Sequence, residues 1–211
     1  DALTHAVESY LTLDSAEFDR GGQVDPGYSG RSSLTMLFAR EAIDLCARFL
    51  MRTYKDGADT EARIGMAYAS HYAALSYGGA GLNAVHGIAY AVAGLTHATH
   101  GSTNAVMLPY VLDALRTVRA TELLEVARLF GIDTRDQAAA LRQLPVLIRD
   151  LIGQLGIPTN LRDFGVGQEH LAGLTRDALA VTRLAKAFPV ADVPSTYERI
   201  IDAAWHGKLG D

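Results

Sequence analysis

Apolar residues recur every three or four positions along most of the chain, which is the period of a helix with one buried face. The clearest case runs from Ser32 to Gly57, where the pattern predicts one long amphipathic helix. Ser32 or Ser33 is expected as its N-cap and Gly57 as its C-terminal stop. Its expected core face consists of Leu34, Leu37, Phe38, Leu45, Cys46, Phe49 and Leu50.

The same period continues through the rest of the sequence. It predicts a helix that carries His86 and Tyr90, and further helices over residues 59–77, 103–118, 121–130, 134–155, 168–186 and 195–206. Ser195 and Glu198 have the spacing of a capping box at the start of the last of these. Alternating strand-like runs are scarce, and hairpin signals are missing. We therefore expect one all-α domain over residues 1–211.

Glycine and proline mark the expected interruptions of these helices. The GGAG stretch at 78–81 is expected to end one helix, and Pro109 is expected to kink or break another. The glycines of GGAG follow no predicted strand and do not fit GxGxxG, so close helix packing is favoured over phosphate binding. Loops or turns are expected at 19–31, 94–100 and 156–161.

Composition narrows the class of protein. The chain has 211 residues, of which 49% are hydrophobic and 20% charged, as in an ordinary globular protein. The net charge is −5, so the sequence does not predict a basic face that could bind nucleic acid. The sequence contains no uninterrupted run of 18 apolar residues, so it does not predict a membrane-spanning helix. The single cysteine, Cys46, excludes an internal disulfide, which fits a cytoplasmic location. Because Cys46 lies on the expected core face of its helix, we expect a buried, inert thiol and not a nucleophile. Because helical sequence follows Asp1 directly, we expect the chain to be part of something larger.

Seven histidines supply the candidate chemistry. Asp1 and His5 stand four residues apart, which places both side chains on one face of a helix. His86 and His100 are separated by 14 residues, enough for a helix and a turn that bring both imidazoles to one point. One carboxylate and three imidazoles together suit a divalent cation such as iron or zinc. Four protein ligands would leave a position for water or a substrate oxygen.

Each part taken alone also has an ordinary explanation. Asp1 and His5 can be an ion pair at a helix start, and His86 can be a hydrogen-bonded core histidine. His97 and His100 can be polar loop residues, and Tyr90 can simply pack against His86. No role is assigned to His71, His170 and His206.

The combination is more specific than its parts. The segments DALTHAVESY and NAVHGIAYAVAGLTHATHGSTNAVMLPYV resemble the iron-containing (group III) alcohol dehydrogenase family. Members of that family carry GxDALTHAxE, then a VHGxxH-type helix, then PHGxxNAxxLPxV. The later segments GIPTNLRDFGV and AAWHG also resemble the family's helical C-terminal half. The resemblance implies the all-α C-terminal domain of the dehydroquinate synthase-like fold.

The resemblance also implies a function and a ligand set. The family's metal ligands carry over to Asp1, His5, His86 and His100, while His97 stays outside the ligand set. The implied metal is Fe(II), or Zn(II), and the implied cosubstrate is NAD(P). The implied reaction interconverts a small alcohol and its aldehyde or ketone, with the metal polarising the substrate oxygen. The implied partner is that small substrate. A homo-oligomer is expected because the missing half of a two-domain enzyme would expose an apolar cleft wall, and charge and hydropathy predict no nucleic-acid or membrane partner.

Three positions depart from the family pattern. Tyr90 stands where many members have a second histidine, so it becomes the candidate catalytic residue, although a phenol relays protons less readily than imidazole at neutral pH. Thr99 replaces the usual proline, and AFPVAD at 187–192 replaces an NPRP-like segment.

The family's dinucleotide-binding domain has no counterpart in this sequence. It is expected to precede this chain in the full-length protein, so the chain alone is expected to be inactive. Two alternatives stay open. One is a relative of glycerol dehydrogenase or dehydroquinate synthase, and the other is a non-catalytic helical interaction domain with an empty site.

Overall fold

The computed structural model describes residues 1–22 and 27–210, and these form an all-helical domain. The helices are α1 Ala2–Leu11, α2 Ser33–Lys55, α3 Thr60–Ala80, α4 Ala84–Thr96, α5 His100–Ala114, α6 Ala120–Leu129, α7 Gln137–Gln154, α8 Leu171–Ala180, α9 Thr182–Ala187 and α10 Val193–His206. Within these described residues, extended pairing is limited to an isolated bridge between Asp14 and Arg31. The expected all-α class is therefore confirmed.

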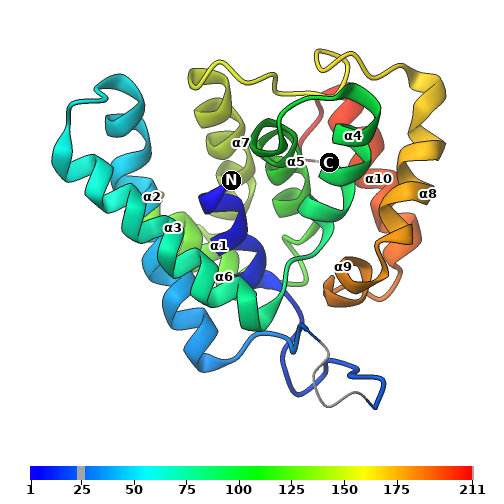
Figure 1. Cartoon of the computed structure of the whole chain (residues 1–211), viewed down its shortest axis with the longest axis horizontal. Helices are drawn as coiled ribbons and strands as arrows, with labels where there is room; N and C mark the ends of the chain where they lie inside the picture. The colour runs from blue at the N-terminus through cyan, green and yellow to red at the C-terminus, as the bar shows by residue number, and fades with distance from the viewer. Residues whose placement is uncertain (23–26, 211) are drawn as a thin grey trace.

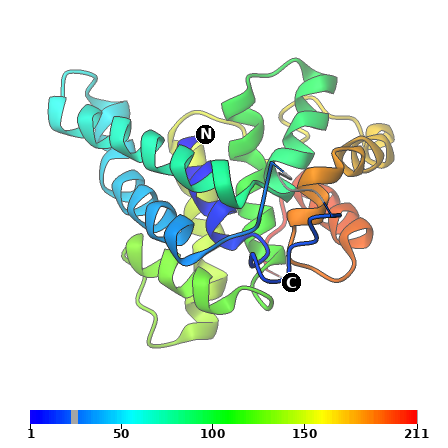
Figure 2. The same ribbon diagram turned by 60° about the horizontal axis from the view of Figure 1, so that its bottom comes forward.

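Helix α1 lies at the centre of the arrangement (Figure 1). The pair α2 and α3 packs on one side of it, where the three helices contact one another extensively. Helices α4, α5, α8 and α10 pack together on the other side, and α7 lies against α5 and α6. The rotated view in Figure 2 shows the same two groups with α1 between them. The position of α1 therefore sets how the two groups meet.

Burial explains why α1 is fixed in place. Ala6, Val7, Tyr10 and Leu11 are each at most 3% exposed, so nearly the whole circumference of this short helix is in the core. A helix of this length is unstable alone in water and depends on such packing. No helix in the part of the chain that the structure describes is long and apolar enough to cross a membrane.

Helix α2 begins where the sequence predicts but buries a different face. The Ser32 side chain accepts from the Thr35 N–H, and the Thr35 hydroxyl accepts from the Ser32 N–H, which makes Ser32 the N-cap. The helix ends at Lys55, two residues before Gly57. The prediction of its core face is partly wrong, since Leu34 and Leu37 are exposed. The buried residues of α2 are Ala39, Ala42, Ile43, Leu45, Cys46 and Phe49.

The buried face includes small residues that the pattern of large apolar residues passes over. Leu34 and Leu37 are 62% and 63% exposed, whereas Ala39 and Ala42 are fully buried. Helix α2 contacts α1, α3 and α6, so its inner face is set by three neighbours. A pattern of large apolar residues cannot reveal a face that is partly made of alanine.

One expected helix break is confirmed and one is wrong. Helix α3 passes Gly78 and Gly79 but ends at Ala80, within the GGAG stretch, with Gly81 as its C-cap; the φ of Gly81, 96°, is in the left-handed region that glycine tolerates. Pro109 lies inside α5 without ending it, so a break at this residue is wrong. Its neighbours Leu108 and Tyr110 are each 2% exposed, so packing outweighs the one backbone hydrogen bond that proline cannot make.

The remaining boundaries differ by smaller amounts. The predicted helix over 168–186 is divided into a 3₁₀ turn, Gln168–His170, and helices α8 and α9, which meet at Val181. The loop expected at 94–100 is shorter, since α4 extends to Thr96 and α5 starts at His100. The capping box is wrong because the Asp192 side chain caps α10 by accepting from the Ser195 N–H. Of the loop expected at 19–31, residues 23–26 lie outside the described residues, and the others form no helix.

Candidate metal centre

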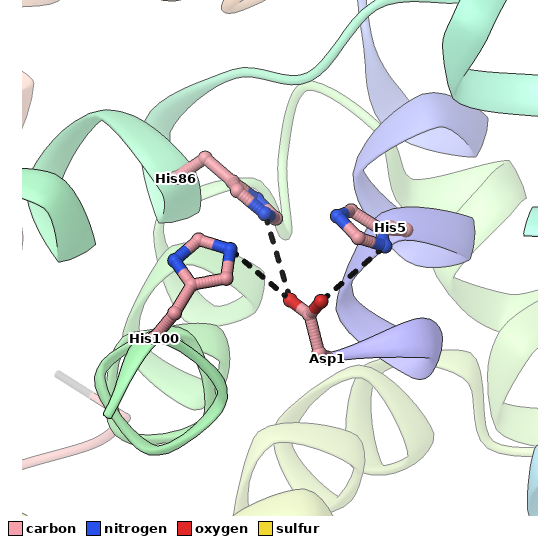
Figure 3. Close-up of side chains that lie close together, drawn as sticks. All are labelled: Asp1, His5, His86 and His100. Atoms are coloured by element: carbon pink, nitrogen blue, oxygen red, sulfur yellow. Dashed lines mark ion pairs between the residues drawn. The ribbon is translucent and has the colours of Figure 1, made fainter. Parts of the chain in front are cut away.

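The N-terminal ends of three helices meet at one point (Figure 3). Asp1 is the N-cap residue of α1, and His5 follows one turn later. His86 is the third residue of α4, and His100 is the first residue of α5. Helices α1, α4 and α5 thus bring together the four residues that the sequence singles out as candidate ligands.

The carboxylate of Asp1 lies at the centre of this group. Its Oδ2 is 3.7 Å from Nδ1 of His5, and its Oδ1 is 3.7 Å from Nε2 of His86 and 3.5 Å from Nε2 of His100. One ligand-type atom from each of the four residues lies within 4.8 Å of the others. Ligands held about 2.1 Å from a shared ion are separated by roughly 3–4 Å, so the spacing fits coordination better than direct hydrogen bonding.

Aromatic contacts hold the imidazoles in orientation. His5 lies between Tyr77 and His86, with ring centroids 4.4 and 4.7 Å away and interplanar angles of 29° and 16°. His100 stacks on Tyr90 at 5.6 Å and 18°, and the rings of Tyr90 and His86 are nearly perpendicular, at 77°, with centroids 5.9 Å apart. The rings therefore form a continuous set of contacts that limits their rotation.

The group has a closed side and an open side. The side chains of His86 and His5 are 1% and 18% exposed, whereas those of Asp1 and His100 are 37% and 44% exposed. Burial lowers the pKa of His5 to about 4 and also lowers the pKa of His100. Both rings are therefore neutral near pH 7, which is the form that binds a metal.

Asn104 provides a test of whether this donor set fits a cation. Its Nδ2 lies 2.9 Å from Oδ1 of Asp1, 3.1 Å from Nε2 of His86 and 3.0 Å from Nε2 of His100. An amide nitrogen has two hydrogens and cannot serve three acceptors. The buried Oδ1 of Asn104 has no hydrogen-bond partner among the described residues. The convergence of more lone pairs than donors is what a divalent cation would satisfy, so the residues fit a metal.

Sequence reasoning assigned no role to two residues of this centre. Glu8 is 1% exposed and its carboxylate contacts Nδ1 of His86, while Asn104 is fully buried among the ligand-type atoms. Both stand at fixed letters of the motifs DALTHAxE and HGxxNA. Their helical spacing was a second signal, since Glu8 follows His5 by three residues and Asn104 follows His100 by four.

The other candidate residues lie around this centre or away from it. Tyr90 is 38% exposed beside His86 and His100. His97 is the C-cap of α4, with a left-handed φ of 56°, and does not belong to the four-residue cluster found among the described residues. Cys46 is 1% exposed in the core, as expected for an inert thiol.

Comparison with known proteins gives consistent results. The family model described as "Fe-containing alcohol dehydrogenase family, C-terminal" matches residues 28–202. Long-chain-alcohol dehydrogenase 1 of Geobacillus thermodenitrificans is 32% identical over 99% of this chain and 49% of its own length. Alcohol dehydrogenase 4 of Saccharomyces cerevisiae is 34% identical over 85% of this chain and 42% of its own. This chain thus spans about half the length of the curated relatives it matches.

A solved structure agrees with these matches. The crystal structure of a 1,3-propanediol oxidoreductase superposes with a TM-score of 0.84 at 29% identity. The alignment covers 97% of this chain and 50% of that one. The helical arrangement that brings Asp1, His5, His86 and His100 together is therefore shared with a protein of known structure.

Proposed function

The chain belongs to the Fe-containing alcohol dehydrogenase family, and from this membership we propose that it is the metal-binding part of an NAD(P)-linked oxidoreductase. The reaction we propose is the interconversion of a small alcohol and its aldehyde or ketone. The observation that carries the proposal is the convergence of Asp1, His5, His86 and His100 from three helix ends. The names of the relatives, all of them alcohol dehydrogenases or oxidoreductases, support the substrate class.

In this proposal the four residues hold Fe(II), or Zn(II), and each has a distinct part. His5 and His86 bind from the closed side, where burial keeps water away. Asp1 supplies a negative charge that offsets part of the ion's charge, and His100 completes the set at the open side. When bound, the metal would supply Lewis acidity toward the substrate oxygen.

Tyr90 is the residue we propose to contact the substrate. Its ring stacks on His100 and is 38% exposed, so the phenol stands at the open side of the centre. A phenol can donate a hydrogen bond to an alcohol or carbonyl oxygen and so orient it. Replacement by phenylalanine would keep the stack and remove only this hydrogen bond.

We propose that NAD(P) is bound by a separate domain that precedes this chain in the full-length protein. The support is that the relatives are about twice as long as the region they share with it. It follows that these 211 residues alone would bind metal without turning over substrate. Aldehyde reduction by this chain alone with NADH or NADPH, at the rate of the full-length protein, would refute this point. A homo-oligomer stays a prediction, which sedimentation of the whole protein can check.

Metal analysis of the whole protein tests the central proposal. We expect about one equivalent of iron or zinc per chain and its loss in His100→Ala, a substitution at a partly exposed position with little effect on the core. His97→Asn is the matched control, because asparagine tolerates the left-handed backbone of residue 97. Full metal content in His100→Ala, or none in the wild type, would refute the proposed site.

Activity provides the second test. We expect the whole protein to reduce short aldehydes with NADH or NADPH, to lose activity on chelation, and to regain it when Fe(II) or Zn(II) is added. Activity that survives complete metal removal would refute the metal-dependent reaction. A protein that binds metal but turns over no alcohol or aldehyde would support the alternative of a non-catalytic domain.

A further inference from the structure

A buried carboxylate lies behind His86. The side chains of Glu8 and His86 are both 1% exposed, and Oε2 of Glu8 contacts Nδ1 of the imidazole. The other carboxylate oxygen of Glu8 accepts hydrogen bonds from the backbone N–H groups of Asn83, at 3.0 Å, and of His86, at 3.2 Å. Both carboxylate oxygens of Glu8 therefore have hydrogen-bond partners, and these partners fix the orientation of the carboxylate.

These contacts determine which nitrogen of His86 carries the hydrogen. A carboxylate only accepts hydrogen bonds, so the contact with Glu8 requires a hydrogen on Nδ1. The lone pair of the ring is then on Nε2, the nitrogen that lies 3.7 Å from Oδ1 of Asp1 and near the other ligand-type atoms. Asn104, whose Nδ2 lies 3.1 Å from the same Nε2, contacts the ring from the opposite end and favours the same tautomer.

The charges around the centre also indicate that Glu8 supports cation binding. Helices α1, α4 and α5 all present their N-terminal ends to it, and such ends carry a partial positive charge that repels a cation. Glu8 sits at the end of α4, where it binds two backbone N–H groups. Its negative charge, together with that of Asp1, offsets this repulsion and balances the charge of a divalent ion.

We propose that Glu8 is a positioning residue of the metal centre, which holds His86 in the tautomer that directs Nε2 toward the ion and supplies a second negative charge. This inference rests on the proposed metal centre. A purely structural alternative is that Glu8 only caps α4. Gln in place of Glu8 distinguishes the two, because its amide oxygen can still accept from the backbone N–H groups that cap α4, whereas its NH₂ group cannot accept from Nδ1 of His86 and the side chain carries no charge.

The first measurement needs no variant. Long-range ¹H–¹⁵N spectra of the metal-free protein report the tautomer of each histidine. We expect His86 to carry its hydrogen on Nδ1 in a single form. A hydrogen on Nε2, or a mixture of both forms, would overturn the inference whatever the metal content.

The second measurement is a Co(II) titration, followed by visible absorption, of the whole protein after chelation. Loss of a group that supports a metal ligand typically weakens binding about 10- to 100-fold, which is the change we expect for Glu8→Gln. Glu122→Gln is the matched control, since Glu122 is also a largely buried carboxylate, 16% exposed, but pairs with Arg31 away from the ligands. It should bind Co(II) as the wild type does.

The outcomes separate this inference from the proposed function. Wild-type protein that binds no Co(II) would refute the metal centre and this inference with it. Wild type and Glu8→Gln that bind Co(II) equally, with the same absorption spectrum, would leave the metal centre standing and overturn only the role of Glu8. Weakened binding in Glu8→Gln with an unchanged unfolding midpoint supports the inference, because a capping role alone would not produce that pair of results.

Discussion

The ring of His5 in α1 lies nearly parallel to the ring of His86 in α4, with centroids 4.7 Å apart and an interplanar angle of 16°. On its other face His5 stacks on Tyr77 at 4.4 Å. The imidazole therefore serves two purposes that can be separated by substitution. Its faces pack between two rings, and its edge presents Nδ1 to the carboxylate of Asp1 at 3.7 Å.

His5→Phe is expected to keep the packing and lose the ligand. Phenylalanine fills the same gap between Tyr77 and His86, so the unfolding midpoint should not fall. Metal affinity should fall by more than the roughly 100-fold that losing a supporting group can cost. Isothermal titration with Zn(II) measures the affinity, and His71→Phe on the exposed face of α3 is the control. Unchanged affinity in His5→Phe would exclude His5 from the ligand set.

Two glycines of α3 should respond to alanine in opposite ways. A Cβ on Gly65 would overlap the ring of Phe49, and that ring is also in contact with the guanidinium groups of Arg48 and Arg52, 4.7 and 5.2 Å from its centroid. Gly65→Ala should therefore destabilise the fold by about 1–3 kcal/mol. Gly78 has open space around it, so Gly78→Ala should stabilise by about 0.5–1 kcal/mol. Urea unfolding measures both, and equal effects would contradict the packing of α2 on α3.

Arg31 is expected to be the most sensitive charged residue outside the metal centre. It is 6% exposed, pairs with Asp14 at 2.9 Å and with Glu122 at 2.7 Å, and donates to the carbonyl oxygen of Tyr10 at 3.0 Å. The hydrogen bonds from Arg31 hold the pKa of Asp14 below its usual range. Arg31→Ala would leave Glu122 largely buried without its partner and should cost about 3–5 kcal/mol.

Thermal and urea unfolding check this expectation. Arg135→Ala is the control, because Arg135 pairs with Asp133 on the fully exposed surface and its loss should be undetectable. If both variants unfold at the same denaturant concentration, the buried network around Arg31 does not contribute to stability.

The candidate metal ligands could be predicted from the sequence, whereas Glu8 and Asn104, which contact His86, were missed. Asp1, His5, His86 and His100 could be selected because two short motifs carry them at fixed spacing, although their role as ligands remains a proposal. Glu8 was missed because its partner, His86, lies 78 residues away, and periodicity shows which face of a helix is polar but not what that face meets. The same limit explains α2, where the exposed Leu34 was expected to be buried.

Backbone signals placed helix ends only approximately, for a related reason. Gly81 ends α3 as the GGAG stretch predicts, yet the helix first passes through Gly78 and Gly79, which have low helix propensity, because its neighbours α1 and α2 stabilise it by packing. Pro109 is likewise held within α5 by a buried surround. Local propensity is worth at most a few kcal/mol at such positions, and burial of adjacent apolar side chains can outweigh it.

Cys46 should report on unfolding of this core. The thiol is 1% exposed on the inner face of α2, and burial raises its pKa to about 12. Because the thiolate is the reactive form, native protein at pH 8 should not react with iodoacetamide, while urea-unfolded protein should take up one label per chain. The labelling rate should therefore follow the population of the unfolded state.

The raised pKa of Cys46 also predicts how stability depends on pH. The unfolded chain loses the thiol proton near pH 9, whereas the folded chain keeps it until about pH 12. Over that interval the unfolded state binds fewer protons, so the contribution of Cys46 to stability decreases as pH rises and is complete only below pH 9. Cys46→Ala removes this dependence, so its free energy of unfolding should approach that of the wild type between pH 9 and 12. A difference in unfolding free energy between wild type and Cys46→Ala that stays constant from pH 9 to 12 would contradict the raised pKa of the thiol. Rapid labelling of the native protein would mean that the α2 core opens without global unfolding.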